Sequence, residues 1–206
     1  MIGPHTRCGK SLFVVHLLRY ISGLACLKIT TFDERPGDEA DSAELVRPNY
    51  YLEEPALLRR PGKDTANYLA AGAVHVERLV CRPPGLAGGL DAALSRFPPR
   101  VPVVVESSRA TPLLAPLAVV LVVRPPLREM KASTAQIISC VTDLLMNVSD
   151  DTTQPTGEAD RLMERYGELR PQHVWSADLS RERPPAEMIQ RLRELLGLCG
   201  RSSESS

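Results

Sequence analysis

Gly3-Pro4-His5-Thr6-Arg7-Cys8-Gly9-Lys10-Ser11 is the stretch that decides the expected fold, and it runs directly into the strongly apolar segment 12–21. Its Gly-Lys-Ser ending is typical of phosphate-binding loops. In such loops a glycine lets the backbone approach a phosphate, and amide groups at a helix N-terminus point at its oxygens. Lys10 then reaches the β- and γ-phosphates, and the Ser11 hydroxyl can ligate Mg²⁺. The predicted phosphate contacts come from Gly3, Thr6, Arg7, Cys8, Gly9, Lys10 and Ser11.

The spacing of this loop differs from the commonest pattern. That pattern has four residues between its glycines, whereas Pro4 holds the position of the first glycine here and Gly3 lies one place further out. A phosphate loop also normally follows a strand, yet only Met1 and Ile2 precede Gly3. We therefore expect either a translation start further upstream or a sheet without its usual first strand. A surface turn that happens to contain Gly-Lys-Ser is the plain alternative.

Apolar runs of strand length alternate with helix-length segments along the rest of the chain. Such alternation predicts a three-layer α/β/α fold with a mostly parallel sheet. We expect one domain over 1–199, with 34–60 as an inserted loop or small subdomain and 200–206 as a disordered tail. The runs 101–105 and 117–123 are almost continuously apolar, as in strands buried on both faces. The expected helices are 12–21, 63–71, 89–97, 133–140, 157–169 and 185–198, and the expected strands are 24–30, 73–81, 101–105, 117–123, 143–148 and 173–176.

Composition excludes several classes of protein. The chain has 206 residues, of which 43% are hydrophobic and 24% are charged, as in ordinary globular domains. Lys and Arg together number 25, the same as Asp and Glu, so no general attraction to nucleic acid or anionic lipid is expected. No apolar run approaches the roughly 20 residues that cross a bilayer, and no secretory signal is evident. We expect a cytoplasmic protein in which Cys26 and Cys140 are buried thiols.

Four further side chains stand where strands are expected to end. Asp33 and Glu106 each follow an apolar run, and a carboxylate at that edge can hold Mg²⁺ beside Ser11. Asn147 and Asp150 have the Asn-x-x-Asp spacing of the base-reading motif of GTP-binding proteins, without its lysine. They favour guanine, although Asn and Asp are also common turn residues. Arg7, with Lys10, can offer positive charge to the transferred phosphate.

Together these segments resemble the SIMIBI class of P-loop NTPases, and most of all the molybdopterin-guanine dinucleotide biosynthesis protein B (MobB) family. The likeness spans roughly residues 1–125 and adds three motifs to the loop: Lys28 to Asp33, Pro61-Gly62-Lys63-Asp64-Thr65 and Ala71-Gly72-Ala73. Glu106 matches the family's acidic residue at a later strand end. Thr30 and Thr31 stand where the family has histidines.

The resemblance implies an accessory protein of molybdenum cofactor maturation that binds GTP or ATP with Mg²⁺. It would hydrolyse GTP slowly, work through a cofactor-biosynthesis partner protein and form a homodimer. Two other functions stay open. A dethiobiotin-synthetase-like ligase or kinase would turn over fast only with a small substrate. A degenerate binding module would show no Mg²⁺-dependent nucleotide binding.

Overall fold

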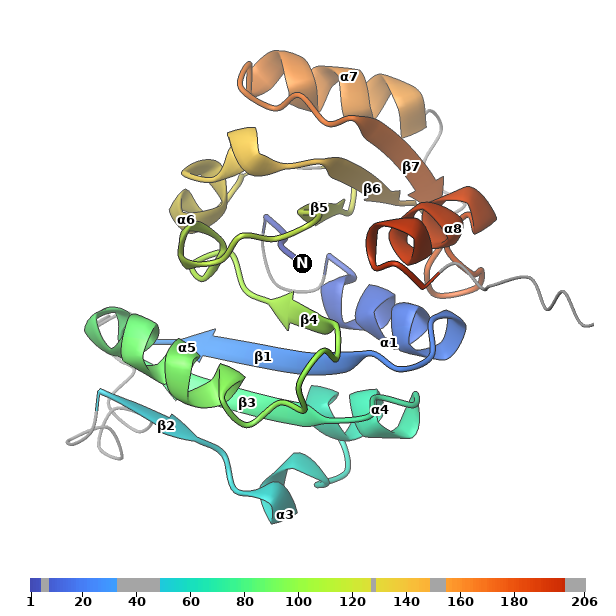
Figure 1. Cartoon of the computed structure of the whole chain (residues 1–206). Coiled ribbons are helices and arrows are strands. Elements are labelled where there is room, and N and C mark those ends of the chain that lie inside the picture. The colour runs from blue at the N-terminus through green and yellow to red at the C-terminus, as the bar shows by residue number, and fades with distance from the viewer. Residues whose placement is uncertain (5–7, 33–48, 127–128, 149–154, 199–206) are drawn as a thin grey trace, which may run out of the picture. The chain divides into compact units, whose positions relative to one another are not determined.

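The computed structural model describes residues 1–4, 8–32, 49–126, 129–148 and 155–198 (Figure 1). The protein is an α/β protein in which helices alternate with the strands of one mixed and one parallel sheet. Its internal contacts divide it into two compact units. Unit 1 comprises Met1–Ile21 and Ala115–Ser206, and unit 2 comprises Ser22–Leu114. The sequence predicts one domain over 1–199, whereas the internal contacts group into these two units.

Unit 1 is built on a parallel three-stranded sheet in the order β5-β6-β7. Ile2 extends this sheet by one residue, because it forms a parallel bridge with Leu121 of β5. The strands are β5 (Val120–Val123), β6 (Asp143–Asn147) and β7 (His173–Ala177). The helices are α1 (Lys10–Tyr20), α6 (Ala132–Ala135), the 3-10 turn Ile138–Cys140, α7 (Pro155–Arg165) and α8 (Ala186–Leu195).

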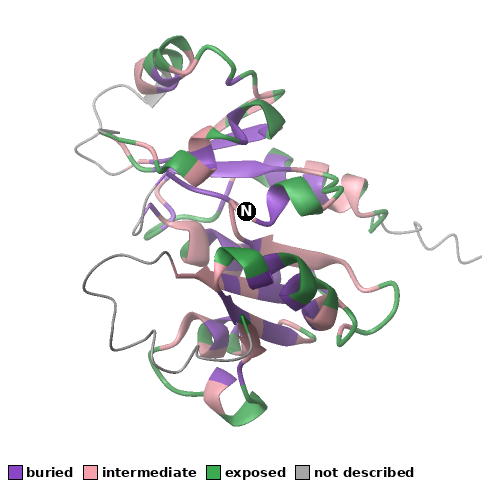
Figure 2. Ribbon diagram, turned by 90° about the vertical axis from the view of Figure 1, so that its left-hand side faces the viewer, coloured by how far each residue is buried: buried purple, intermediate pink, exposed green. Residues whose placement is uncertain are grey.

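The core of unit 1 is apolar. All four residues of β5 are buried, which confirms the expectation for 120–123, whereas Leu117 at the start of the expected run is exposed. Figure 2 colours the ribbon by burial and shows that the strands are mostly buried. Leu144 of β6 is fully buried and packs with Ile2, Leu121 and Leu162 in one cluster. Burying a side chain of this kind contributes about 1.5–3 kcal/mol. The sheet is therefore held mainly by side chains of β5, β6 and α7.

Unit 2 is built on a four-stranded sheet in the order β2-β3-β1-β4, in which only β2 runs antiparallel to its neighbour. The strands are β1 (Ala25–Thr31), β2 (Tyr50–Leu52), β3 (Val76–Cys81) and β4 (Val103–Glu106). The helices are α3 (Pro55–Leu58), α4 (Asp64–Ala70) and α5 (Leu86–Leu94), with 3-10 turns at Pro83–Gly85 and Thr111–Leu113.

The two faces of this sheet differ in polarity. Leu27 and Leu79 point to the face that packs against Leu90 of α5 in an apolar cluster. Because successive strand residues alternate between faces, Lys28 and Arg78 point to the other face, where α4 lies. One face of unit 2 is thus mainly an apolar core, with the buried Glu77 among its residues, and the opposite face carries Lys28 and Arg78.

Most expected elements are confirmed to within a few residues, and three details are wrong. The expected helix 133–140 is divided into α6 and the 3-10 turn. Cys26 is buried as expected, but Cys140 is exposed at the end of that turn. The residues Val103–Val105 are only half-buried, because β4 is the last strand of its sheet.

The region 34–60 and the tail are only partly tested. Residues 33–48 and 199–206 lie outside the described residues. The remainder of the expected insertion contains β2 and α3. Among the helices that the structure describes, none combines the length and apolar character needed to cross a bilayer.

Candidate functional site

The predicted phosphate loop starts from a sheet residue. The Ile2 amide donates to the carbonyl of Val120 at 3.0 Å, and the Val122 amide donates to the carbonyl of Ile2 at 3.1 Å. Ile2 therefore holds the place of the strand that a phosphate loop normally follows. The chain then leaves the sheet at Gly3 and returns as α1, whose first residue is Lys10.

Three carbonyl groups tie this loop to other parts of unit 1. The Gly3 carbonyl accepts from the Thr134 hydroxyl at 3.0 Å, and the Pro4 carbonyl accepts from the Lys131 amide at 3.0 Å. The Cys8 carbonyl accepts from the side-chain amide of Asn147 at 3.1 Å. In a trans peptide the N–H points opposite to the C=O. The Gly9 N–H is therefore directed away from Asn147, as a phosphate loop requires.

Both glycines of the loop are required by the space around them. A Cβ atom at Gly3 would lie 2.5 Å from the Cys8 sulfur and 2.9 Å from Cδ of Lys10. Gly9 has φ +103°, and a Cβ atom there would lie 2.4 Å from Nδ2 of Asn147. The left-handed backbone at the start of a helix is open to glycine at little cost. Gly3, Cys8, Gly9 and Asn147 are thus closely packed, while residues 5–7 of the predicted loop lie outside the described residues.

Lys10 and Ser11 begin α1 on the loop side. The Lys10 ammonium folds back over the loop and donates to the Cys8 sulfur at 3.4 Å. A thiol sulfur is a weak acceptor, so an anionic oxygen in the same place would bind this ammonium far more strongly. Ser11 is half-buried at the second position of the helix.

Asn147, predicted from the sequence as a base-reading residue, lies at the loop. It ends β6 and is 7% exposed. Its Nδ2 donates to the Cys8 carbonyl, and its Oδ1 accepts from the Leu179 amide at 3.1 Å. The structure thus brings together two predicted segments that are 139 positions apart. The observed contacts of this amide are with backbone groups of unit 1.

The other predicted site residues are not assembled in this way. Thr6, Arg7, Asp33 and Asp150 lie outside the described residues. The predicted metal ligands Ser11 and Glu106 belong to different units, and each is described within its own. Within the part of the chain that the structure describes, no three His, Cys, Asp or Glu side chains group as a metal site.

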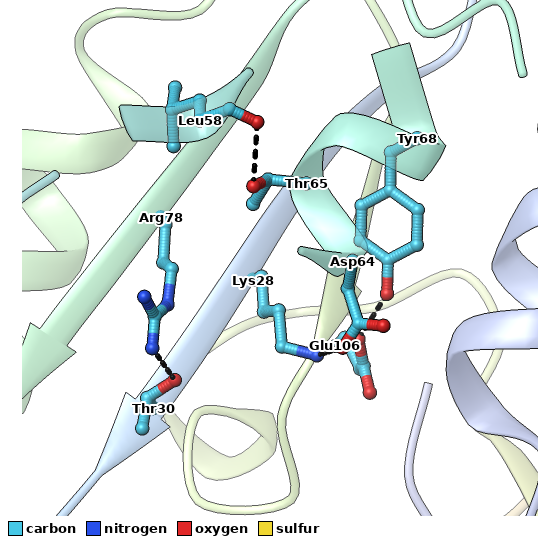
Figure 3. A network of polar contacts seen from close by, with 8 residues as sticks. All are labelled: Lys28, Thr30, Leu58, Asp64, Thr65, Tyr68, Arg78 and Glu106. Atoms are coloured by element: carbon cyan, nitrogen blue, oxygen red, sulfur yellow. Dashed lines mark hydrogen bonds and ion pairs between the residues drawn. The ribbon is translucent and has the colours of Figure 1, made fainter. Parts of the chain in front are cut away.

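Glu106 belongs to a buried polar network in unit 2 (Figure 3). It ends β4 and is 6% exposed. Its Oε2 accepts from the buried Tyr68 hydroxyl at 2.5 Å and lies 3.2 Å from the Lys28 ammonium. Lys28 is also paired with Asp64 of α4. The ammonium therefore lies between two carboxylates on the α4 side of the sheet.

The electrostatics of this network favour the charged lysine. Burial by itself lowers the pKa of Lys28, but the Glu106 charge and the bond to Asp64 outweigh it and raise that pKa above its usual range. Cys26 lies two residues earlier on the same face, and burial raises the pKa of its thiol. Cys26 is therefore a neutral packing residue, and the charges beside it are already paired.

The sequence does not predict that Lys28, Asp64, Tyr68 and Glu106 form one network. The one signal was the scarcity of lysine, because Lys28 is one of only four lysines among 25 basic residues. The sequence also favours Asp64 as a helix cap. In the structure Lys63 takes the cap position without a side-chain cap bond, and Asp64 is the first helical residue. Tyr68 carries no sequence signal, since aromatic residues at helical spacing usually pack in a core.

A second buried carboxylate ties together the C-terminal elements of unit 1. Asp143 at the start of β6 is fully buried and accepts from Arg191 of α8 and from Trp175 of β7, each at 3.0 Å. Thr142 donates to it at 2.7 Å. Burial by itself raises the pKa of Asp143, but these hydrogen bonds outweigh it and hold that pKa below its usual range. Asp143 is therefore a structural anchor for β7 and α8.

Comparison with known proteins adds no assignment. No family model, no curated protein and no solved structure matches this chain.

Proposed function

We propose that unit 1 binds a purine nucleoside triphosphate, GTP, together with Mg²⁺, in a P-loop arrangement. The observation that carries this proposal is the junction of Asn147 with the Cys8 carbonyl and Gly9. Ile2 and β6 both flank β5 in a parallel arrangement, so the two predicted motifs follow strand ends at one edge of the sheet, which is where parallel α/β sheets bind ligands. A nucleotide spans from its phosphates to its base, so one ligand requires both motifs in one unit.

The chemistry follows from the residues of the loop. The backbone from Gly3 to Ser11 would surround the phosphates, with the Lys10 ammonium moving from the Cys8 sulfur to phosphate oxygens. The Ser11 hydroxyl would hold Mg²⁺, which offsets phosphate charge when bound. Thr6, Arg7 and Asp150 of unit 1 are the proposed further contacts.

The biological role that we propose follows the family resemblance. The protein would hydrolyse GTP slowly and serve as a homodimeric accessory in molybdenum cofactor maturation, through a partner protein. The three-layer P-loop architecture belongs to the same proposal. The parallel sheet of unit 1 and the loop that leaves it after Ile2 support it.

Calorimetric titration with GTP and with ATP, each with and without Mg²⁺, tests the binding. We expect Mg²⁺-dependent GTP binding that Lys10→Ala weakens about tenfold or more, since a charged contact to phosphate is lost. Arg19→Ala is the matched control, because it removes a positive charge from the exposed end of the same helix. Its affinity should stay within about twofold of wild type.

Three outcomes of this titration would decide against GTP binding at the loop. Absence of nucleotide binding, or equal binding by the Lys10→Ala variant, overturns the proposal and favours a degenerate module. A clear preference for ATP, with turnover that rises only when a small carboxylate or hydroxyl substrate is supplied, favours the ligase or kinase alternative.

A further inference from the structure

His16 of α1 contacts the turn that follows β7. Its Nε2 lies 2.9 Å from the carbonyl oxygen of Leu179, and its ring stacks on Tyr20 with centroids 6.3 Å apart. A carbonyl oxygen only accepts hydrogen bonds, so Nε2 carries a proton. The Nδ1 atom is buried with no hydrogen-bond partner among the described residues. A proton there would be left unpaired at a cost, so the contacts of the ring favour the hydrogen on Nε2.

Leu179 connects His16 to the loop through Asn147. Its amide donates to Oδ1 of Asn147, whose Nδ2 donates to the Cys8 carbonyl. Its side chain lies 3.5 Å from where a Cβ atom of Gly9 would be, so it packs beneath the glycine. His16 thus joins the middle of α1 to the residue before Gly9 through one backbone segment and one amide.

The turn that carries Leu179 is itself well defined. The Asp178 carboxylate accepts from the amide of Ser180 at 2.9 Å, and the Asp178 carbonyl accepts from the amide of Glu182 at 2.7 Å. Leu179 is 1% exposed. Among the described residues, the polar contacts that hold Leu179 toward the loop are those of its backbone with Asn147 and His16, and its side chain packs beneath Gly9.

We propose that His16 is a positioning residue for the loop 3–11, acting through Leu179 and Asn147. This inference rests on the proposed function only where it concerns GTP affinity. A donor at position 16 holds the Leu179 carbonyl, which keeps the Leu179 amide directed at Asn147 and so keeps the Cys8 carbonyl turned away from the phosphate side. Loss of that donor loosens the loop without removing any group that would touch the ligand.

The first test needs no nucleotide. Amide hydrogen exchange of the ligand-free protein is compared for wild type, His16→Leu and His16→Gln. We expect His16→Leu to speed exchange at the first amides of α1 about threefold to tenfold, the effect of one hydrogen bond. In His16→Gln the Nε2 of the amide can replace the ring donor, so exchange should stay within about twofold of wild type. If His16→Leu and His16→Gln exchange these amides at the same rate, the inference is overturned.

The second test measures GTP dissociation with Mg²⁺ for the same variants, with Arg19→Ala as the control. His16→Leu should release GTP about threefold to tenfold faster, and His16→Gln should release it as wild type does. If wild type binds no GTP, the proposed function fails, whereas the exchange experiment still decides the role of His16. Faster exchange with unchanged GTP release would restrict His16 to a structural role and overturn the positioning claim.

A third measurement uses wild type alone and does not depend on how a variant folds. The ¹⁵N spectrum of the His16 imidazole should show the Nε2–H tautomer, with a proton protected from exchange with solvent. A Nδ1–H tautomer would contradict the contact with Leu179 and sink the inference.

Discussion

Gly9 shows how the absence of a Cβ atom in glycine allows a close backbone contact in unit 1. Its left-handed backbone turns the chain into α1, and the bare Cα lets the Asn147 amide approach the Cys8 carbonyl. Gly23 is also left-handed, with φ +80°, yet nothing lies within 4 Å of the position of a Cβ atom there. The two residues share backbone strain and differ in crowding, so they form a natural pair for comparison.

We predict that Gly9→Ala destabilises the protein more than Gly23→Ala does. Both variants lose about 1–2 kcal/mol from the left-handed backbone. Gly9→Ala also displaces Asn147, which adds about 1–3 kcal/mol for its unmade buried hydrogen bonds. Urea unfolding of the two variants measures the difference. Because Gly9→Ala already breaks the Asn147 contact, adding Asn147→Ala to it should lower the free energy of unfolding only slightly further. Equal destabilisation by Gly9→Ala and Gly23→Ala would show that the Asn147 contact contributes no stability.

At the scale of elements, Asp143 links two strands and a helix of unit 1. It lies in β6 and accepts hydrogen bonds from β7 and α8, so three elements meet at one carboxylate. Arg193 of α8 adds a bond to the Tyr20 carbonyl at 2.5 Å, which joins α8 to the end of α1. Hydrogen bonds of Asp143 and Arg193 thus hold β6, β7, α8 and α1 together, in addition to the apolar packing of unit 1.

This arrangement predicts a pH dependence of stability. The folded-state pKa of Asp143 lies below its ordinary value of 3.8. The unfolded chain therefore takes up the proton first, so the contribution is complete above about pH 4 and is lost as pH falls through the folded pKa. Near pH 6, Asp143→Asn should lose about 2 kcal/mol, and the gap to wild type should narrow below pH 4.

Urea unfolding followed by the fluorescence of Trp175 measures this gap, because the chain has one tryptophan and it contacts Asp143. The exposed Asp160→Asn variant is the control and should stay within about 0.5 kcal/mol of wild type at pH 6. A gap that stays constant from pH 6 to pH 3 would show that the carboxylate charge contributes nothing.

The whole molecule contains two units with different kinds of interior. Of the residues that the structure describes, unit 1 buries a single paired carboxylate, Asp143, beside its apolar sheet, whereas unit 2 groups Lys28, Glu106 and Asp64 on one face of its sheet. Paired buried charges add little net stability, but removal of one partner leaves the others unpaired. Unit 2 should therefore be the more sensitive of the two to loss of a single charge.

We predict that Lys28→Met destabilises the protein by about 3 kcal/mol, since Glu106 and Asp64 lose their shared cation. Hydrogen exchange should rise in β1, β4 and α4, which hold the network. Lys63→Met is the control. The partner of Lys63, the buried Glu53, keeps its ion pair with Arg78, so this loss of stability should stay below about 1 kcal/mol. Addition of Glu106→Gln to Lys28→Met should restore part of the loss. An equal effect of both lysine variants would contradict the network.

Much of the fold could be predicted from local patterns. Apolar runs of strand length and amphipathic stretches predict β5, β6, α1 and α8, because period and length are properties of neighbouring residues. The division of 133–140 could not be predicted this way, since its two halves differ only in how they pack. Half-burial of Val103–Val105 follows from the place of β4 in its sheet, which the run itself does not encode.

The amino-acid sequence by itself determined the alternation of strands and helices and the Gly-Lys-Ser loop ahead of α1, because these depend on residues close together in the chain. The tertiary structure alone decided which distant side chains meet. It joined Asn147 to Cys8 across 139 positions and Lys28 to Glu106 across 78. Such contacts depend on strand order and register, and these are set by the packing of whole elements rather than by any local pattern.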